Sequence, residues 1–148
     1  MTNHENLEYI KRGFDYWFRN DFEKALVYYE KALEINSNDI VTLLDRAQCL
    51  QILRKYEESL EVFEDVIKLD LDVYPTYEKK LNELDNELQI PGWRSLHLPV
   101  MRKIDLQSVL VGKIISLEAL KKEKEVKECK NRIFEWHKSK LNSKNPTF

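Results

Sequence analysis

The sequence predicts an all-α protein in which antiparallel helix pairs stack side by side. Three observations support this fold class. The first is composition: only three Gly and four Pro occur in 148 residues, while 34% of the residues are charged and 43% are hydrophobic. Few helix breakers and many Leu, Glu and Lys residues favour helices. The other two are an internal repeat of 34 residues and apolar residues at helical spacing.

The chain matches itself when it is shifted by 34 residues. The corresponding pairs are Gly13 and Ala47, Phe22 and Tyr56, Ala25 and Ser59, Tyr29 and Phe63, Ala32 and Val66, and Asn36 and Asp70. Small residues let two helix axes approach closely, and large residues fill the space between them. One helix pair cannot bury its own apolar face, so such pairs stack on one another.

The stretch from Asp21 to Asp39, with the helix before it, resembles the tetratricopeptide repeat family, whose repeats are 34 residues long. The residues that fit the family's pattern are Gly13, Tyr16, Ala25, Tyr29 and Ala32. The resemblance covers about residues 6–88, although Ser37 and Leu71 stand where the family usually has Pro. It implies a tetratricopeptide-type superhelix in which the first helix of each pair, helix A, lines a concave surface.

Two complete repeats are expected, over residues 6–39 and 40–73. Their four helices are expected at about residues 5–19, 21–35, 40–53 and 56–69. In the first repeat Asn20 and Asp21 form the turn, and the Asp21 side chain suits the N-cap of the second helix.

Residues 74–104 are expected to form a degenerate third repeat. Pro75 suits the first turn of a helix, and the residues from Ile90 to Trp93 (IPGW) break that helix. We expect Trp93 to fill the space left by the missing second helix. The alternative is a loop that presents the Trp93 ring to a ligand.

Residues 105–141 are expected to form a last, repeat-like helix pair that caps the stack, so that the whole chain is a single helical-repeat domain. The first helix is expected over about residues 105–122. In the second helix Cys129, Ile133 and Trp136 are aligned with Ala25, Tyr29 and Ala32. Since Trp136 stands where a small residue belongs, we expect no further repeat to stack there. Residues 142–148 should fray.

Charge is unevenly distributed along the chain. Residues 121–144 carry nine basic and four acidic residues, a net charge of +5, and residues 1–120 carry a net charge of −7. The basic helix is either a patch for nucleic acid or an acidic partner, or a solvated helix whose Lys and Glu residues pair. We favour the solvated helix and expect no nucleic-acid partner. Docking of this helix on the acidic repeats is a further possibility.

The concave surface is the expected binding site for a protein or peptide partner. The residues that the family register places there are Leu7, Ile10, Phe14, Trp17, Val41, Leu44, Asp45, Gln48 and Gln51, with Glu78, Asn82 and Asp85 from the third repeat. Phe14 and Trp17 would form an exposed aromatic pair suited to anchor a partner. Alternatively, the chain's own C-terminal helix or a second copy of the protein covers this apolar set.

One subgroup of the family binds a C-terminal carboxylate with a clamp of Lys and Asn residues. The clamp positions here are Ile10, Phe14, Asp45, Pro75 and Lys79. Only Lys79 has suitable chemistry, and Asp45 would repel a carboxylate. We therefore exclude the clamp function.

No catalytic site, cofactor or metal site is predicted. His4, His97 and His137 are scattered, and the chain has no phosphate-binding loop, dinucleotide fingerprint or nucleophile motif. No signal peptide or membrane-spanning stretch is visible. Cys49 and Cys129 lie at apolar helix positions and suit a reduced, cytoplasmic protein.

The sequence thus predicts a non-catalytic module that scaffolds or recruits a partner peptide or helix in its concave groove. The alternatives are a homodimer formed through the same apolar surface and an accessory subunit of an enzyme.

Overall fold

The computed structural model describes residues 3–69, 86 and 106–144. In this part of the chain the protein is all α-helical and contains no strand, which confirms the predicted fold class. The helices are α1 (Asn3–Phe18), α2 (Phe22–Ile35), α3 (Ile40–Ile52), α4 (Tyr56–Ile67), α7 (Leu106–Ala119) and α8 (Glu123–Lys144). The expected third repeat over residues 74–104, with Trp93, lies outside the described residues apart from Asn86 and stays a prediction.

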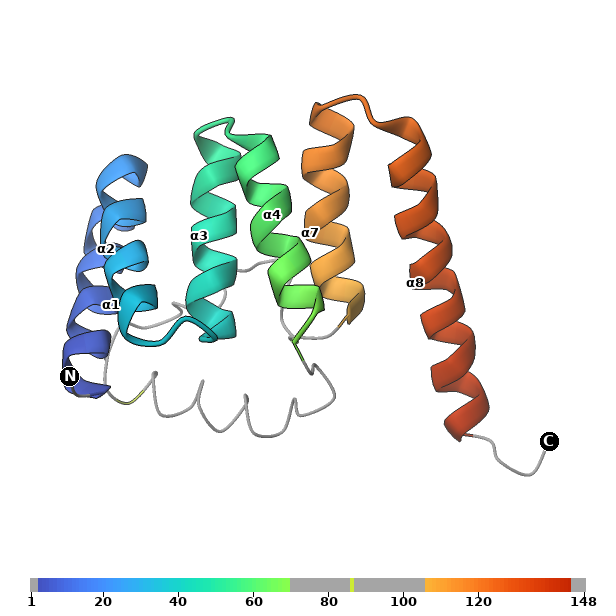
Figure 1. Ribbon diagram of the computed structural model, residues 1–148, viewed down its shortest axis with the longest axis horizontal. Coiled ribbons are helices and arrows are strands. Elements are labelled where there is room, and N and C mark those ends of the chain that lie inside the picture. Colours follow the sequence, from blue (N-terminus) through green and yellow to red (C-terminus); the bar gives the residue numbers. More distant parts are fainter. Residues whose placement is uncertain (1–2, 70–85, 87–105, 145–148) are drawn as a thin grey trace.

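The helices form a row of antiparallel pairs (Figure 1). Each described helix packs against the next, and α4 packs directly against α7 although a long segment separates them in sequence. The pair α7–α8 therefore continues the stack begun by α1–α2 and α3–α4. The helices α1, α3 and α7 are the A helices of these three pairs.

The same turn joins the two helices of each pair. Asn20, Arg54 and Lys121 have positive φ angles of 58°, 62° and 57°. In each case the next residue donates its backbone N–H to a carbonyl five residues earlier, from Asp21 to Tyr16, from Lys55 to Leu50 and from Lys122 to Leu117. Residues other than Gly seldom adopt a positive φ, so the three turns are structurally equivalent.

This equivalence corrects the alignment of the last pair by three residues. Lys122 corresponds to Asp21, so Val126, rather than Cys129, takes the place of Ala25. In the same register Lys130 takes the place of Tyr29, and Ile133 takes that of Ala32. The sequence alignment missed this because Leu120, Lys121 and Lys122 are not residue types that mark a turn.

The N-terminus of α2 is capped as expected. The Asp21 carboxylate accepts a hydrogen bond from the backbone N–H of Lys24 at 3.2 Å. It thereby satisfies one of the N–H groups that the first turn of a helix leaves without a partner.

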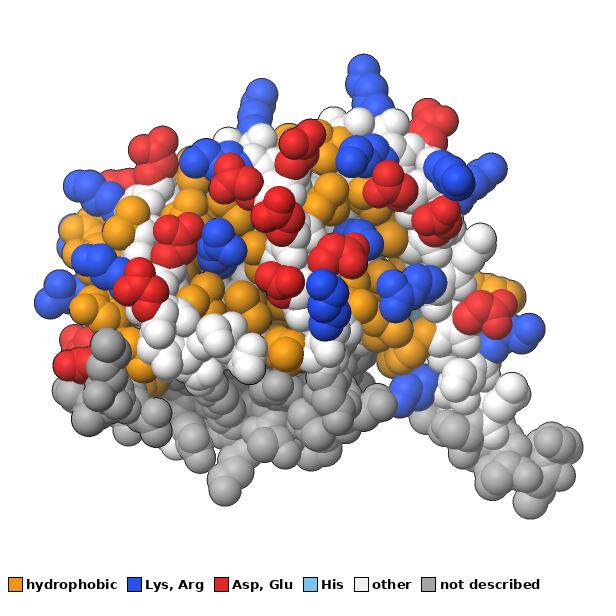
Figure 2. Space-filling view, viewed as in Figure 1, with side chains coloured by type: hydrophobic (Ala, Val, Ile, Leu, Met, Phe, Trp, Pro, Cys, Tyr) orange, Lys and Arg blue, Asp and Glu red, His pale blue; other side chains and the backbone are white. Residues whose placement is uncertain are grey.

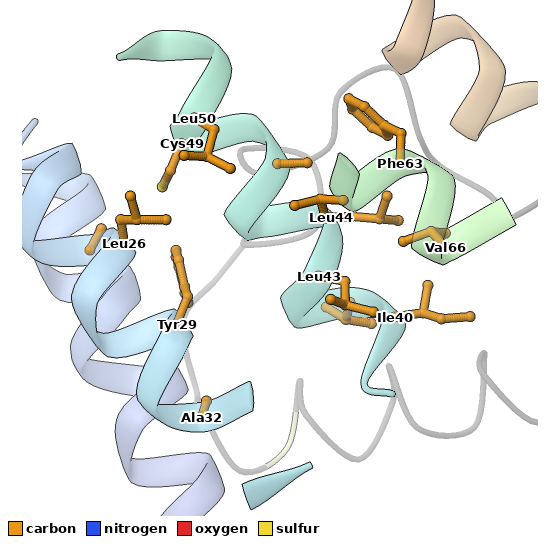
Figure 3. Close-up of a cluster of buried hydrophobic side chains, with 14 of the residues drawn as sticks. Leu26, Tyr29, Ala32, Ile40, Leu43, Leu44, Cys49, Leu50, Phe63 and Val66 are labelled. Atoms are coloured by element: carbon orange, nitrogen blue, oxygen red, sulfur yellow. The ribbon is translucent and has the colours of Figure 1, made fainter. Parts of the chain in front are cut away.

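The main core lies between the first two pairs, with Tyr29 of α2 near its centre (Figure 3). Tyr29 is fully buried and meets Phe14 edge to face, with 5.8 Å between ring centroids. Its ring also lies against Gly13 of α1: a Cβ on Gly13 would stand 2.5 Å from Tyr29 Cε1. The close approach of α1 and α2 thus requires a residue without a side chain at position 13.

A polar chain of hydrogen bonds joins α3, α4 and α7. Gln51 Nε2 donates to Ser116 Oγ at 2.8 Å and to the Gly112 carbonyl at 2.9 Å. Ser116 and Ser59 are 2.7 Å apart, and Ser59 donates to the Tyr56 carbonyl at 2.6 Å. Since the single proton of Ser59 goes to Tyr56, Ser116 must donate to Ser59.

A second apolar cluster and an ion pair complete this end of the stack. Leu110 and Leu117 of α7 pack with Val126 and Cys129 of α8. On α7, Lys113 pairs with Glu64 of α4. The buried stripe of α8 therefore faces α7, and α8 does not dock back on the first repeat.

The Gly13→Ala substitution should destabilise the protein. Overpacking costs about 1–3 kcal/mol, and the better helix propensity of Ala offsets about 1 kcal/mol of this. In a Tyr29→Leu background the clash is absent, so the same substitution should raise the free energy of unfolding. Urea unfolding of the four proteins gives both values, and a loss of equal size in both backgrounds would contradict the tight Gly13–Tyr29 contact.

The Ser116→Val substitution should weaken the junction of α4 and α7. It removes the acceptor of Gln51 and the donor to Ser59, and we expect a loss of about 1–3 kcal/mol in the free energy of unfolding. Ser139→Val makes the same change at an exposed position of α8 and should alter stability by less than about 0.5 kcal/mol. Equal effects of the two substitutions in urea unfolding would argue against the hydrogen-bonded chain.

Candidate functional site

Most of the residues predicted for the concave surface are buried in the chain itself. Ile10, Phe14, Val41, Leu44 and Asp45 are almost completely inaccessible. Leu7, Trp17, Gln48 and Gln51 are half-buried. As a set they cannot contact a partner in this arrangement, and their role in binding stays a prediction.

The expected exposed aromatic pair is not present. Phe14 is fully buried against Tyr29, and Trp17 packs edge to face on Phe22 with 5.0 Å between ring centroids. The C-terminal helix does not provide this cover, because α8 lies at the opposite end of the row from α1 (Figure 1). An apolar side chain that has a core to enter gains more there than at the surface.

Gln51 also differs from expectation. Its amide nitrogen is used in the junction with α7, where it donates to Gly112 and Ser116. This side chain positions a helix in the stack.

The three equivalent turns show which residues of the A helices share a register position. Phe14 on α1 corresponds to Gln48 on α3 and to Ile115 on α7. One turn further along, Phe18 corresponds to Ile52. Residues four apart lie on the same side of a helix, so all of these positions belong to the inner face.

Three apolar side chains are exposed at these inner-face positions. Phe18, Ile52 and Ile115 are 45%, 42% and 46% exposed. With the half-buried Trp17 and Gln48 they form what we term the open band, which crosses α1, α3 and α7 toward the C-terminal ends of these helices. The sequence alignment missed Ile115 because its three-residue error put Glu118 at the position of Phe14.

A group of buried ionisable side chains, Tyr29 of α2 with Asp45 and Cys49 of α3, lies between these two helices. The pKa of Asp45 is raised well above its usual range by burial and, second, by the charge of Asp39. Burial also raises the pKa of Tyr29, with further contributions from Asp45 and Cys49. The pKa of Cys49 is raised by burial and by Asp45.

These pKa shifts bear on the chemistry available at the site. A reactive cysteine needs a lowered pKa, whereas burial raises the pKa of both Cys49 and Cys129. Within residues 3–69 and 106–144, no three His, Cys, Asp or Glu side chains gather in a way that could hold a metal ion. In the same ranges, no helix combines the length and apolar character needed to cross a membrane.

Stacked antiparallel helix pairs with A helices along one face define a helical-repeat protein. Models of the tetratricopeptide repeat match this chain twice, over residues 7–39 and over residues 42–73. These ranges contain all of α2 and α4 and most of α1 and α3. The chain therefore contains two tetratricopeptide repeats, and these repeats indicate a protein–protein interaction module.

Relatives share only parts of this chain. An uncharacterized protein of Methanocaldococcus jannaschii is 40% identical over 55 residues, which are 37% of this chain and 64% of that protein. Tetratricopeptide repeat protein 21B of Mus musculus is 27% identical over 75% of this chain but only 8% of its own length. The STIP1 homolog of Dictyostelium discoideum is 29% identical over 42% of this chain and 11% of its own length. The chain therefore spans less than two thirds of each of these relatives.

The raised pKa of Asp45 predicts a specific pH dependence of stability. The folded state holds the Asp45 proton more tightly than the unfolded state, whose pKa is about 3.9. The protonated Asp45 therefore contributes to the free energy of unfolding in full below pH 4. This contribution is lost as the pH rises toward the folded-state pKa, by at most about 1.4 kcal/mol per pH unit. Relative to the wild type, Asp45→Asn should therefore be more stable at pH 7 than at pH 4.

Urea unfolding at both pH values measures this difference. Asp65→Asn, at an exposed position of α4, is the matched control and should shift stability by less than about 0.5 kcal/mol at either pH. If the stability of Asp45→Asn relative to the wild type fell between pH 4 and pH 7, the assigned direction would be wrong.

Proposed function

We propose that this chain is a non-catalytic scaffold that binds a segment of another protein along the open band. The observation that carries this proposal is the exposure of Phe18, Ile52 and Ile115 at inner-face positions of three successive A helices. Apolar side chains that stay exposed in a row are typical of interaction surfaces. The repeats of this chain supply the family context for such a role.

The arrangement favours a partner segment that is apolar and extended or helical. Exposed side chains on neighbouring parallel helices offer separate anchor points, which suits a partner with apolar residues at regular intervals. The half-buried Gln48 shares the register position of Ile115 and lies one turn before Ile52, and its amide nitrogen is a donor for the partner's backbone. The A helices α1 and α3 are held in the core by their buried side chains, Ile10, Phe14, Val41 and Leu44.

The buried and free cysteines are compatible with the proposed cytoplasmic location. Cys49 and Cys129 are both reduced and buried. A reducing compartment leaves such thiols unpaired.

The surface can be tested with charged substitutions at exposed positions. Ile52→Asp and Ile115→Asp place a carboxylate in the open band without filling or emptying the core. Val27→Asp is the matched control, because Val27 is 48% exposed but lies on the B helix α2. Circular dichroism should show that all three variants remain folded.

We expect proteins captured by the wild type from its host cells to be lost with Ile52→Asp and Ile115→Asp and retained with Val27→Asp. With a purified partner, each open-band substitution should weaken binding about tenfold or more, which corresponds to at least about 1.4 kcal/mol. Equal capture by all variants would reject the open band. Sedimentation of the free protein shows whether it dimerises. If the wild type is a dimer and Ile115→Asp is a monomer, a second copy of this chain occupies the open band.

A further inference from the structure

Helix α8 has an outer face that no part of the described chain covers. Its inner stripe follows Val126, Cys129, Ile133 and Trp136, and the first three of these side chains pack in the apolar cluster with α7. The residues on the opposite side step by four, three, four and three positions and are all exposed. We term them the outer stripe: Lys127, Asn131, Phe134, Lys138 and Leu141.

The outer stripe contains the two most exposed large apolar side chains of the described chain. Phe134 is 61% and Leu141 is 62% exposed. They lie seven residues apart, so they are two turns apart on one side of the helix. Figure 1 shows that the C-terminal end of α8 extends past the end of α7. A partner could therefore reach the outer stripe without contacting the rest of the stack.

The spacing of the outer stripe is that of a helix-pairing seam. Alternating steps of three and four residues keep side chains facing a second helix along its length. Phe134 and Leu141 then occupy one of the two seam positions, and Asn131 and Lys138 occupy the other. Polar residues such as Asn and Lys at a seam select the partner and its register at some cost in stability.

The charges of the stripe define the chemistry of that partner. Lys127 and Lys138 lie in the seam, Lys130 flanks it, and Lys138 Nζ stands 5.7 Å from the centre of the Phe134 ring. A second α8 would offer these lysines no carboxylate from its own outer stripe in either orientation, and in a parallel pair it would oppose them with lysines, which is unfavourable. The acidic helix α4 of a second copy is also a poor match for the stripe, because α4 has no exposed large apolar side chain to meet Phe134 and Leu141. Its exposed acidic residues are Glu57, Glu58, Glu61 and Asp65.

Nucleic acid and membranes fit the outer stripe less well. Glu128 and Glu135 border the stripe and would repel phosphate groups. Figure 2 shows acidic and basic side chains interspersed over the face of the stack that it presents, without one continuous basic field. Two apolar side chains two turns apart are too few to anchor a helix in a lipid surface.

We propose that the outer stripe of α8 pairs with an amphipathic helix of another protein. That helix places Glu or Asp residues opposite Lys127 and Lys138 and apolar residues opposite Phe134 and Leu141. This contact is separate from the open band, which lies on α1, α3 and α7, and it takes a partner of different chemistry.

Site-specific photo-cross-linking of the full chain in its host cells tests this proposal. The photoreactive residue p-benzoylphenylalanine replaces Phe134, and a second sample carries it in place of Val27 as the control for random encounters. We expect a discrete protein adduct from position 134 alone, with the cross-link mapped by mass spectrometry to a helix rich in Glu or Asp. Adducts to nucleic acid, to lipid, to a second copy of this chain or to a segment without acidic residues would overturn the proposal, as would the absence of any adduct.

Charge reversal provides the second arm. Lys127→Glu with Lys138→Glu should reduce the adduct from position 134 at least tenfold. Lys55→Glu with Lys68→Glu makes the same change in net charge at exposed positions flanking α4 and should leave the adduct unchanged. All these positions are exposed, so circular dichroism should show intact helices, and an equal effect of the two double substitutions would contradict pairing at the outer stripe.

Discussion

The arrangement of the stack depends on the hydrogen-bonded chain that runs from Gln51 through Ser116 and Ser59 to the Tyr56 carbonyl. Gln51 donates two hydrogen bonds and each serine hydroxyl donates one, and together they link α3 and α4 to α7, which is far from both in sequence. A purely apolar contact tolerates sliding of one helix along another, whereas a buried hydrogen bond is lost when its partners move by an ångström or two. The polar chain therefore fixes the height of α7 relative to α3 and α4.

That height determines the inner face of the protein. Because Gln51 meets Gly112 and Ser116, the third A helix is aligned with the first two, and Ile115 comes to the register position of Gln48. The same contact consumes the amide nitrogen of Gln51, a residue that the family register alone assigns to ligand binding. The Gln51 side chain thus aligns the helices that carry the open band, and its amide nitrogen bonds α7 rather than a ligand.

The sequence predicted the helices of the first two repeats because local chemistry determines them. Asp21 caps α2, and Gly13 permits the close packing of Tyr29, as their residue types indicate. The register of the last pair could not be predicted, since its turn depends on a positive φ at Lys121, a residue with no preference for that conformation. The burial of Phe14 could not be predicted either, because the exposure of a side chain depends on packing across the whole stack rather than on helical periodicity.

The corrected register also bears on whether another helix pair could stack on the outer face of α8. Tyr29 fills the space between its own pair and the next A helix, and its hydroxyl lies close enough to Asp45 and Cys49 of α3 for their charges to raise its pKa. The corresponding residue of α8 is Lys130, which is exposed. A further pair stacked on α8 would bury this ammonium group where the earlier pairs bury an aromatic ring, at a cost that an unpaired charge makes prohibitive. A helix with Phe134 and Leu141 on its outer side is therefore closed to another repeat while it remains open to a partner that brings its own carboxylates.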